Sequence, residues 1–275
     1  MQNERFLLFP GFRLKALTFS YDDCVNEDVR LVETFRKNSL KGTFNINSEL
    51  LGRNGKMTLE EAKALYGDDM EVALHGAQHL PLKKMSTAVA MRDVLVDREN
   101  LERGFGKIIR GMAYAYGSYN EEVVEMLRDA GIAYSRTTKN TNKFNLPDDW
   151  LTLHPTCHHS SEDLDKLTEE FIAPVDESSS SYWRINPKLF YVWGHSYEFR
   201  DNNNWELIEK FCELMGKQKD VWFATNIEIY SYVKAFESLV FSSDLTFVEN
   251  PSATDVYLKV NKKKIVAKAG ELTRL

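Results

Sequence analysis

The sequence has few cysteines, no excess of positive charge and no long apolar run. Its three cysteines, Cys24, Cys157 and Cys212, are an odd number without close spacing, so neither a disulfide framework nor a cysteine-based zinc site is indicated. Lysine and arginine total 35 against 41 aspartates and glutamates, giving a formal charge of -6. Such a balance argues against a surface that follows nucleic-acid phosphates. We therefore expect neither a nucleic-acid partner nor a membrane span.

The N-terminal apolar stretch Phe6-Leu7-Leu8-Phe9 is too short for the core of a signal peptide. It follows Glu4 and is followed by Pro10-Gly11, without a small-residue cleavage site. We therefore expect a cytoplasmic protein. At 275 residues with 43% hydrophobic side chains, the chain can form one barrel-sized domain or two smaller ones.

Short apolar runs alternate with stretches of helical spacing along most of the chain. The runs expected to be strands are 14–19, 41–47, 70–74, 108–115, 132–135, 150–154, 189–193 and 221–224. The stretches expected to be helices are 25–37, one opening at Thr58, 86–102, 119–130, 161–172, 205–216 and 226–237. Polar loops are expected at 137–149 and in the serine-rich stretch 178–181. This repeat predicts an α/β fold with seven or eight parallel strands and helices outside.

Beyond about residue 238 the pattern changes to alternation, with expected strands at 245–248, 255–260 and 265–267. We therefore predict two domains, a barrel over 1–237 and a small all-β appendage over 238–275. The lysines at 262–264 are expected at a solvated hairpin turn.

Two clusters of polar residues follow predicted strands. Asp22 and Asp23 come after the first strand, and His75-Gly76-Ala77-Gln78-His79 comes after 70–74. Two histidines with this spacing and one carboxylate form a metal-ligand set with open positions. Alone, the histidines would more simply be ordinary loop residues. Two adjacent buried carboxylates, however, are costly without a cation, and this favours a metal site.

Four strand ends resemble, in order and position, the motifs of the polysaccharide deacetylases, the NodB-homology group of carbohydrate esterase family four. These are Thr18-Phe19-Ser20-Tyr21-Asp22-Asp23, the His75 to His79 stretch, Ala115-Tyr116-Gly117-Ser118-Tyr119 and Trp193-Gly194-His195-Ser196. The resemblance extends over roughly residues 14 to 225, and the combination is more specific than any single motif. It implies a distorted (β/α) barrel of about seven parallel strands, in agreement with the pattern above.

The resemblance also implies the roles of the site residues. Asp23, His75 and His79 would bind one divalent ion, with zinc first and cobalt, nickel, manganese or iron as alternatives. Asp22 would be the general base and His195 the general acid. The backbone N–H of Tyr116 would stabilise the oxyanion.

The third motif departs from the family, because Ala113 and Ala115 replace its arginine and proline. The arginine orients the catalytic base, so another residue must hold Asp22. Alternation along the strand points Arg110 outward, whereas Arg136 closes the next strand. We therefore predict a hydrogen bond from Arg136 to Asp22. Cys24 stands where the family usually has glycine.

Other rim residues allow more than one interpretation. Trp150, Trp193 and Tyr116 lie at strand ends and are equally consistent with stacking on sugars and with core packing. The stretch His154-Pro155-Thr156-Cys157-His158-His159 has no standard zinc spacing, so substrate contact or loop packing is favoured over a second metal.

The function predicted from these residues is metal-dependent removal of an acyl group, acetyl first, from the amide nitrogen of an N-acetylated sugar or oligosaccharide. The lack of an export signal favours small saccharides over a cell-wall polymer. One alternative is a non-catalytic saccharide-binding protein that lost turnover with the motif-three arginine. Another is hydrolysis of a non-sugar amide on the same scaffold. The retained base and acid favour catalysis. The oligomeric state does not follow from the sequence.

Overall fold

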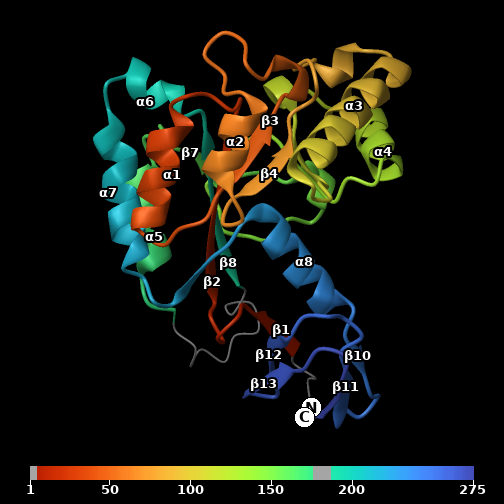
Figure 1. Ribbon diagram of the computed structural model, residues 1–275. Coiled ribbons are helices and arrows are strands. Elements are labelled where there is room, and N and C mark those ends of the chain that lie inside the picture. The colour runs from red at the N-terminus through yellow and green to blue at the C-terminus, as the bar shows by residue number, and fades with distance from the viewer. Residues whose placement is uncertain (1–4, 176–186) are drawn as a thin grey trace.

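The computed structural model describes residues 5–175 and 187–275. The expected serine-rich loop at 178–181 lies outside the described residues. Figure 1 shows a large upper body and a smaller lower one, joined by the long helix α8.

The upper body is built on one curled parallel sheet. Its strands are β2 (Lys15–Asp22), β3 (Thr43–Ile46), β4 (Glu71–Leu74), β5 (Gly111–Ala113), β6 (Tyr134–Arg136), β7 (Cys157–His158), β8 (Lys188–Gly194) and β9 (Val221–Phe223). Seven strands follow the order β6-β5-β4-β3-β2-β8-β7, and β9 pairs with the first half of β2. This is the predicted distorted barrel, whose central strand β2 is buried throughout.

Helices surround the sheet, as the βαβ pattern predicts (Figure 1). They are α1 (Asp28–Lys37), α2 (Leu59–Tyr66), α3 (Thr87–Phe105), α4 (Glu121–Asp129), α5 (Leu164–Ile172), α6 (Tyr197–Asp201), α7 (Trp205–Gly216) and α8 (Asn226–Glu237). Four 3₁₀ turns are present among the described residues, η1 (Ser48–Leu50), η2 (Leu82–Lys84), η3 (Ala115–Gly117) and η4 (Trp150–Thr152). Thr58 begins α2 with the predicted capping box, in which its hydroxyl and the Glu61 carboxylate each bind a free backbone N–H.

One predicted strand is wrong. Residues 150–154 were expected to form a strand, but Trp150–Thr152 form η4 and the strand begins only at Cys157. Asp149 accepts a hydrogen bond from the N–H of Leu151, and this cap favours a helical turn. The turn lies beside β6, where Leu153 bridges to Arg136, so it covers the edge of the sheet.

The lower body contains two three-stranded antiparallel sheets. Their strands are β1 (Arg5–Leu8), β10 (Val240–Phe241), β11 (Phe247–Glu249), β12 (Val256–Val260), β13 (Lys263–Ala267) and β14 (Leu272–Arg274). The sheet orders are β1-β12-β13 and β10-β11-β14. The sequence pattern missed β1, which pairs with β12 although the predicted division put residues 5–8 in the first domain. The boundary at 237/238 stays a prediction.

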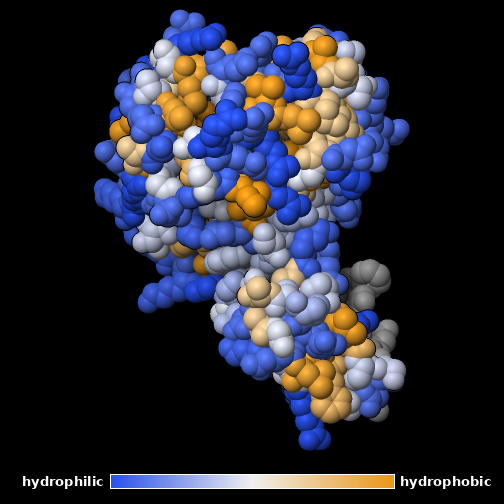
Figure 2. Space-filling view, turned by 45° about the vertical axis from the view of Figure 1, so that its right-hand side comes forward, coloured by the Kyte–Doolittle hydropathy of each residue, from blue (hydrophilic) through white to orange (hydrophobic). Residues whose placement is uncertain are grey.

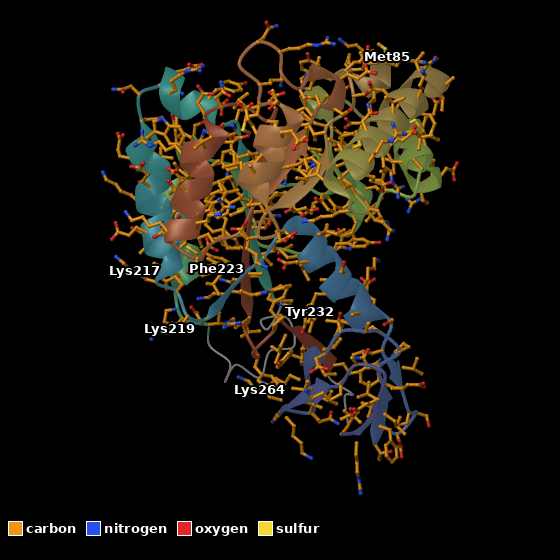
Figure 3. The ribbon with its side chains drawn as sticks, viewed as in Figure 1. Met85, Lys217, Lys219, Phe223, Tyr232 and Lys264 are labelled. Carbon is orange, nitrogen blue, oxygen red and sulfur yellow. The ribbon has the colours of Figure 1, made fainter. Side chains whose placement is uncertain are left out.

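Tyr232 of α8 connects the two bodies, as its position in Figure 3 indicates. Its hydroxyl donates to the carbonyl of Leu8 at 2.7 Å and accepts from the N–H of Tyr257 at 2.9 Å. One buried side chain thus binds both β1 and β12 to the helix.

The surface of the lower body has apolar areas (Figure 2). In the sheet β10-β11-β14 the exposed apolar side chains are Val240, Phe247 and Leu272. Within residues 5–175 and 187–275, no helix is both long enough and apolar enough to span a membrane. A cytoplasmic location stays a prediction.

Candidate active site

The carboxyl ends of the parallel strands carry most of the predicted site residues. Asp22 ends β2, His75 follows β4, Arg136 ends β6 and His195 follows β8. Parallel strands in one sheet end at the same edge, here called the rim. The fold therefore brings together residues that lie far apart in the sequence.

Asp23, His75 and His79 form a group whose ligand atoms all lie within 4.8 Å of one another. The Nδ1 of His75 is 2.9 Å from the carbonyl oxygen of Ala113, which can only accept, so this nitrogen carries the proton. In neutral His75 the Nε2 then carries a lone pair, and this nitrogen faces the Nε2 of His79 at 3.2 Å. Two ligands about 2.1 Å from one ion are about 3.0 to 3.4 Å apart. The donor set therefore fits a divalent metal ion.

Carboxylates of α3 hold the loop that carries these histidines. Asp97, fully buried, accepts the N–H of His75 at 3.0 Å and that of Ser48 at 2.8 Å. Asp93 accepts the N–H of Gln78 at 2.9 Å. The backbone of the histidine loop is thereby fixed to α3 and, through Asp97, to η1. Such outer hydrogen bonds orient metal ligands.

Asp22 is held by a buried guanidinium. The Nη2 of Arg136 donates to its Oδ2 at 2.5 Å, and the Nδ2 of Asn45 donates to its Oδ1 at 2.8 Å. The hydrogen bond predicted from the sequence is therefore confirmed. Although burial opposes ionisation, Arg136, with His75 and His195, holds the pKa of Asp22 below its usual value. Asp22 is thus a carboxylate at neutral pH.

Arg136 reaches Asp22 from the strand beside Ala113. In the β5-β6 pair, Arg136 lies directly opposite Ala113, so its side chain reaches the same part of the rim from the next strand. Its guanidinium also stacks on the ring of Trp193, 4.4 Å from the centroid. Arg110 instead binds the carbonyl of Gly131 on the outside, as alternation predicted.

Asp23 lies in an unusual backbone turn. Both Asp23 and Cys24 have positive φ, 84° and 54°, a conformation that glycine adopts most easily. Cys24, which has a side chain, adopts this conformation at some cost in strain. Burial by itself would raise the pKa of Asp23, but His75 and Lys56 outweigh burial and hold this pKa below its usual value.

His195 connects two carboxylates. Its Nε2 is 3.8 Å from Asp22 Oδ2, and its Nδ1 is 3.4 Å from Glu198 Oε1. Burial would lower the pKa of His195, but Glu198 and Asp22 outweigh it and raise the pKa above its usual value. This shift favours the protonated imidazole, whose Nε2 faces Asp22.

Glu198 also binds two neighbouring histidines of β7 and the turn after it. Its Oε2 is 3.2 Å from His158 Nε2 and 3.1 Å from His159 Nε2, and these three residues are a second group that could hold a metal. However, the backbone N–H of Ser160 donates to His158 Nδ1 at 3.2 Å. The Nε2 of neutral His158 must then carry the proton, so it donates to Glu198 and has no lone pair for an ion. His158, His159 and Glu198 are therefore best explained as a hydrogen-bonded cluster.

The three predicted aromatic residues have different positions. Tyr116 is 69% exposed, has a φ of 57° and lies with its ring 4.4 Å from that of His79. Trp193 is only 9% exposed and donates from Nε1 to Asn140, so it forms a wall of the site. Trp150 is buried against Tyr230 of α8 and is not brought to the rim. Of these three aromatic residues, Tyr116 has the largest exposed surface at the site.

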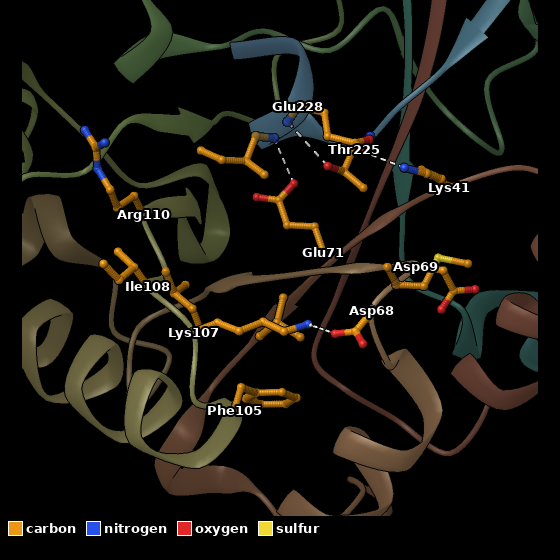
Figure 4. A pocket seen from close by; sticks show the side chains of 14 residues that line it. Lys41, Asp68, Asp69, Glu71, Phe105, Lys107, Ile108, Arg110, Thr225 and Glu228 are labelled. Atoms are coloured by element: carbon orange, nitrogen blue, oxygen red, sulfur yellow. Dashed lines mark hydrogen bonds and ion pairs between the residues drawn. The ribbon is translucent and has the colours of Figure 1, made fainter. Parts of the chain in front are cut away.

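A separate pocket of about 220 Å³ lies at the opposite end of the barrel, where β3, β4 and β5 begin (Figure 4). Its inner wall includes the buried Glu71, which accepts hydrogen bonds from Tyr134, Thr43 and the N–H of Ile227. Burial raises the pKa of Glu71 to about 7. The pocket contains none of the predicted site residues.

Sequence reasoning missed Glu198, Asn45 and Lys56. Glu198 follows His195 by three residues at the start of a helix, and this spacing was a usable signal. Asn45 and Lys56 belong to no motif, and only the folded chain places them beside the two aspartates.

Comparison with protein families gives a match to the polysaccharide deacetylase model over residues 12–135. This segment contains the first three of the four motifs, so the resemblance found from them is confirmed; the motif of His195 lies beyond it. Comparison with curated protein sequences gives no match.

Solved structures with the same fold include a Mycobacterium smegmatis protein that bears the polysaccharide deacetylase name. The TM-score is 0.60 at 14% identity, over 84% of this chain and 94% of that one. A carbohydrate esterase family four pseudoenzyme from Bacillus anthracis has a TM-score of 0.51 at 17% identity, over 78% and 65%. At these identities the likeness shows the fold alone, and the predicted distorted barrel is confirmed.

A Streptococcus pyogenes deacetylase in complex with acetate is 20% identical, with a TM-score of 0.45. The match covers 49% of this chain and 61% of the Streptococcus pyogenes chain.

Proposed function

From the polysaccharide deacetylase homology of residues 12–135, we propose that this protein is a metal-dependent hydrolase that removes an acetyl group from the amide nitrogen of an N-acetylated saccharide. One observation carries the proposal. The ligand group Asp23, His75 and His79 lies beside Asp22, whose Oδ2 is 3.8 Å from the Nε2 of His195. Base, acid and metal ligands thus meet at one rim.

Asp23, His75 and His79 would hold the divalent ion, with zinc first among the candidates. When bound, such an ion supplies Lewis-acid activation of water and of the acyl carbonyl. Burial, and the neighbouring His75, lower the pKa of His79 to about 4, so this imidazole is neutral at physiological pH. Neutral imidazole is the form that binds metals.

Asp22 would accept the proton of the attacking water. Its carboxylate is kept ionised and aimed by Arg136 and Asn45, so its geometry does not depend on the substrate. The buried pair of Asp22 and Arg136 is almost free of solvent, with 3% and 0% of the side chains exposed. Little reorganisation is then needed when the proton arrives.

His195 would donate a proton to the departing amine nitrogen. Its Nδ1 lies 3.4 Å from Glu198 Oε1, and its Nε2 lies on the side of the ring that faces Asp22, 3.8 Å from Oδ2. An amine is a poor leaving group without such protonation. The backbone N–H of Tyr116, which follows β5 at the rim, is proposed to bind the oxyanion. The exposed ring of Tyr116 is proposed to contact the saccharide.

The test combines metal analysis with acetate release from N-acetylated mono- and oligosaccharides. His79→Ala should lower metal content sharply, whereas Asp22→Asn should keep the metal and lose turnover. His154→Ala is the matched control for metal content, because this imidazole binds Thr137 and lies outside the ligand group. Full metal content in His79→Ala would contradict the ligand assignment. A metal-loaded wild type that binds saccharides without releasing acetate would favour the non-catalytic alternative.

A further inference from the structure

Lys56 binds one of the proposed metal ligands. Its Nζ donates to both the Oδ1 and the backbone carbonyl of Asp23 at 2.8 Å, and it lies 3.4 Å from Asn47 Oδ1. Only 16% of each side chain of the Lys56–Asp23 pair is exposed. The ammonium therefore lies at the edge of the group formed by Asp23, His75 and His79.

The backbone around Lys56 is fixed to the chain that follows Asp23. Val25 bridges to Lys56, the N–H of Met57 donates to Cys24 at 3.0 Å, and the N–H of Asn26 donates to Gly55 at 3.2 Å. The position of the lysine is thus set by paired backbone.

The charges of the two aspartates are balanced by the protein itself. Arg136 binds Asp22 and Lys56 binds Asp23, so each carboxylate has one cation at hydrogen-bonding distance. The sequence suggested that a metal ion is needed to offset this carboxylate pair. In the folded chain that need is met by Arg136 and Lys56 without an ion.

We propose that Lys56 and the divalent ion compete for the negative charge of Asp23. The inference rests on the proposed function, because it assumes that Asp23 is a ligand of the ion. A neutral N–H next to a ligand strengthens metal binding, but an ammonium repels the ion that shares its carboxylate. Lys56 therefore keeps the site assembled when no ion is bound, and it weakens binding of the ion by about tenfold.

Competition of this kind is reciprocal. If Lys56 weakens binding of the ion, then the ion must reduce the stabilisation that Lys56 gives to the fold by the same factor. Removal of the ammonium should thus have opposite effects in the two states. It should destabilise the metal-free protein and tighten metal binding.

The experiment compares wild type with Lys56→Met, which keeps the aliphatic stem and loses the charge. Metal-free proteins are titrated with Co²⁺ by visible absorption and with Zn²⁺ against a chelator, and thermal unfolding is followed with and without the ion. We expect about tenfold tighter binding in Lys56→Met and a larger rise in Tm on metal addition than in wild type. Lys56→Arg should bind within a few-fold of wild type.

Lys217→Met is the matched control. Lys217 pairs with Glu213 on the exposed face of α7, and Figure 3 shows it at the lower left of the upper body, away from the small sheets. Both its metal affinity and its unfolding should equal those of wild type.

Weaker or unchanged metal binding in Lys56→Met, beside a wild type that binds one ion, would overturn the competition and leave the proposed function intact. Weaker binding would instead make Lys56 a clamp that positions Asp23. Absence of binding in wild type and Lys56→Met alike would refute the metal-dependent function and the competition together. Binding gained only by Lys56→Met would support the competition.

Discussion

The buried pair of Arg136 and Asp22 allows a quantitative test of how the site is held. Arg136→Met removes the guanidinium but keeps an unbranched side chain of similar length. It leaves Asp22 with the amide of Asn45 at 2.8 Å and with His75 and His195 no closer than 3.7 Å. Removing one partner of a buried ion pair costs about 3–5 kcal/mol. At about 2–3 °C per kcal/mol for a domain of this size, Tm should fall by roughly 6–15 °C.

The loss should depend on pH in a defined direction. Arg136 keeps the pKa of Asp22 below its unfolded value, so the pair stabilises the fold above that value and loses its effect as pH falls through the folded pKa. Wild type and Arg136→Met should therefore differ most at neutral pH and converge only as pH falls through the lowered pKa of Asp22 in the folded protein.

Two further variants make the test specific. Arg128→Met removes an arginine whose side chain is 54% exposed and whose partners are Glu125 and Asp149, and it should cost less than about 0.5 kcal/mol. The double variant Asp22→Asn, Arg136→Met removes both charges and should recover most of the lost stability. The free energy of unfolding and the Tm of wild type and the three variants are measured by chemical and thermal unfolding. Equal stabilities of Arg136→Met and Arg128→Met, or no recovery in the double variant, would refute the reasoning.

Three other changes have expected outcomes. Glu198→Gln removes the charge that raises the pKa of His195, so the alkaline limb of the pH–activity profile should move to lower pH. An alkaline limb at the wild-type pH would contradict the proposal that His195, paired with Glu198, is the general acid. Burial raises the pKa of Glu71 to about 7 from 4.5, so the free energy of unfolding should fall by up to about 3 kcal/mol as pH rises from 4.5 to 7. In Glu71→Gln the free energy of unfolding should depend less on pH over this range. Gly194→Ala places a methyl group 2.1 Å from the Nδ1 of His159, which stacks between two aromatic rings, and should cost about 1–3 kcal/mol in unfolding experiments.

Local patterns predicted those parts of the molecule that depend on local interactions. Helices α7 and α8 begin and end where their spacing predicts, because each has an apolar face and α8 also begins with a capping box at Thr225. The positions of Asp22, Asp23 and the histidines after β4 followed from strand ends, since parallel strands share one edge. The Arg136 contact followed from alternation along neighbouring strands.

The rest depends on contacts between distant segments. Trp150 has the sequence surroundings of a strand residue, but its ring packs on Tyr230 of α8, and no local pattern encodes that contact. Lys56 lies in a loop without periodicity, and its pairing with the turn after Asp23 appears only in the folded chain. The two other histidine partners of Glu198, His158 and His159, come from β7 and the turn after it, and no local pattern connects them to α6.

The pairing of β1 with β12 has a consequence for synthesis on the ribosome. Arg5 lies opposite Val260, so β1 acquires its sheet partner only after nearly the whole chain has been translated. At about 5–20 residues per second, the edge of β1 stays unpaired for roughly 10 to 50 s. An unpaired apolar strand is a template for association with other chains. The barrel can thus fold during translation, while the nascent chain carries an exposed strand that a holding chaperone would protect.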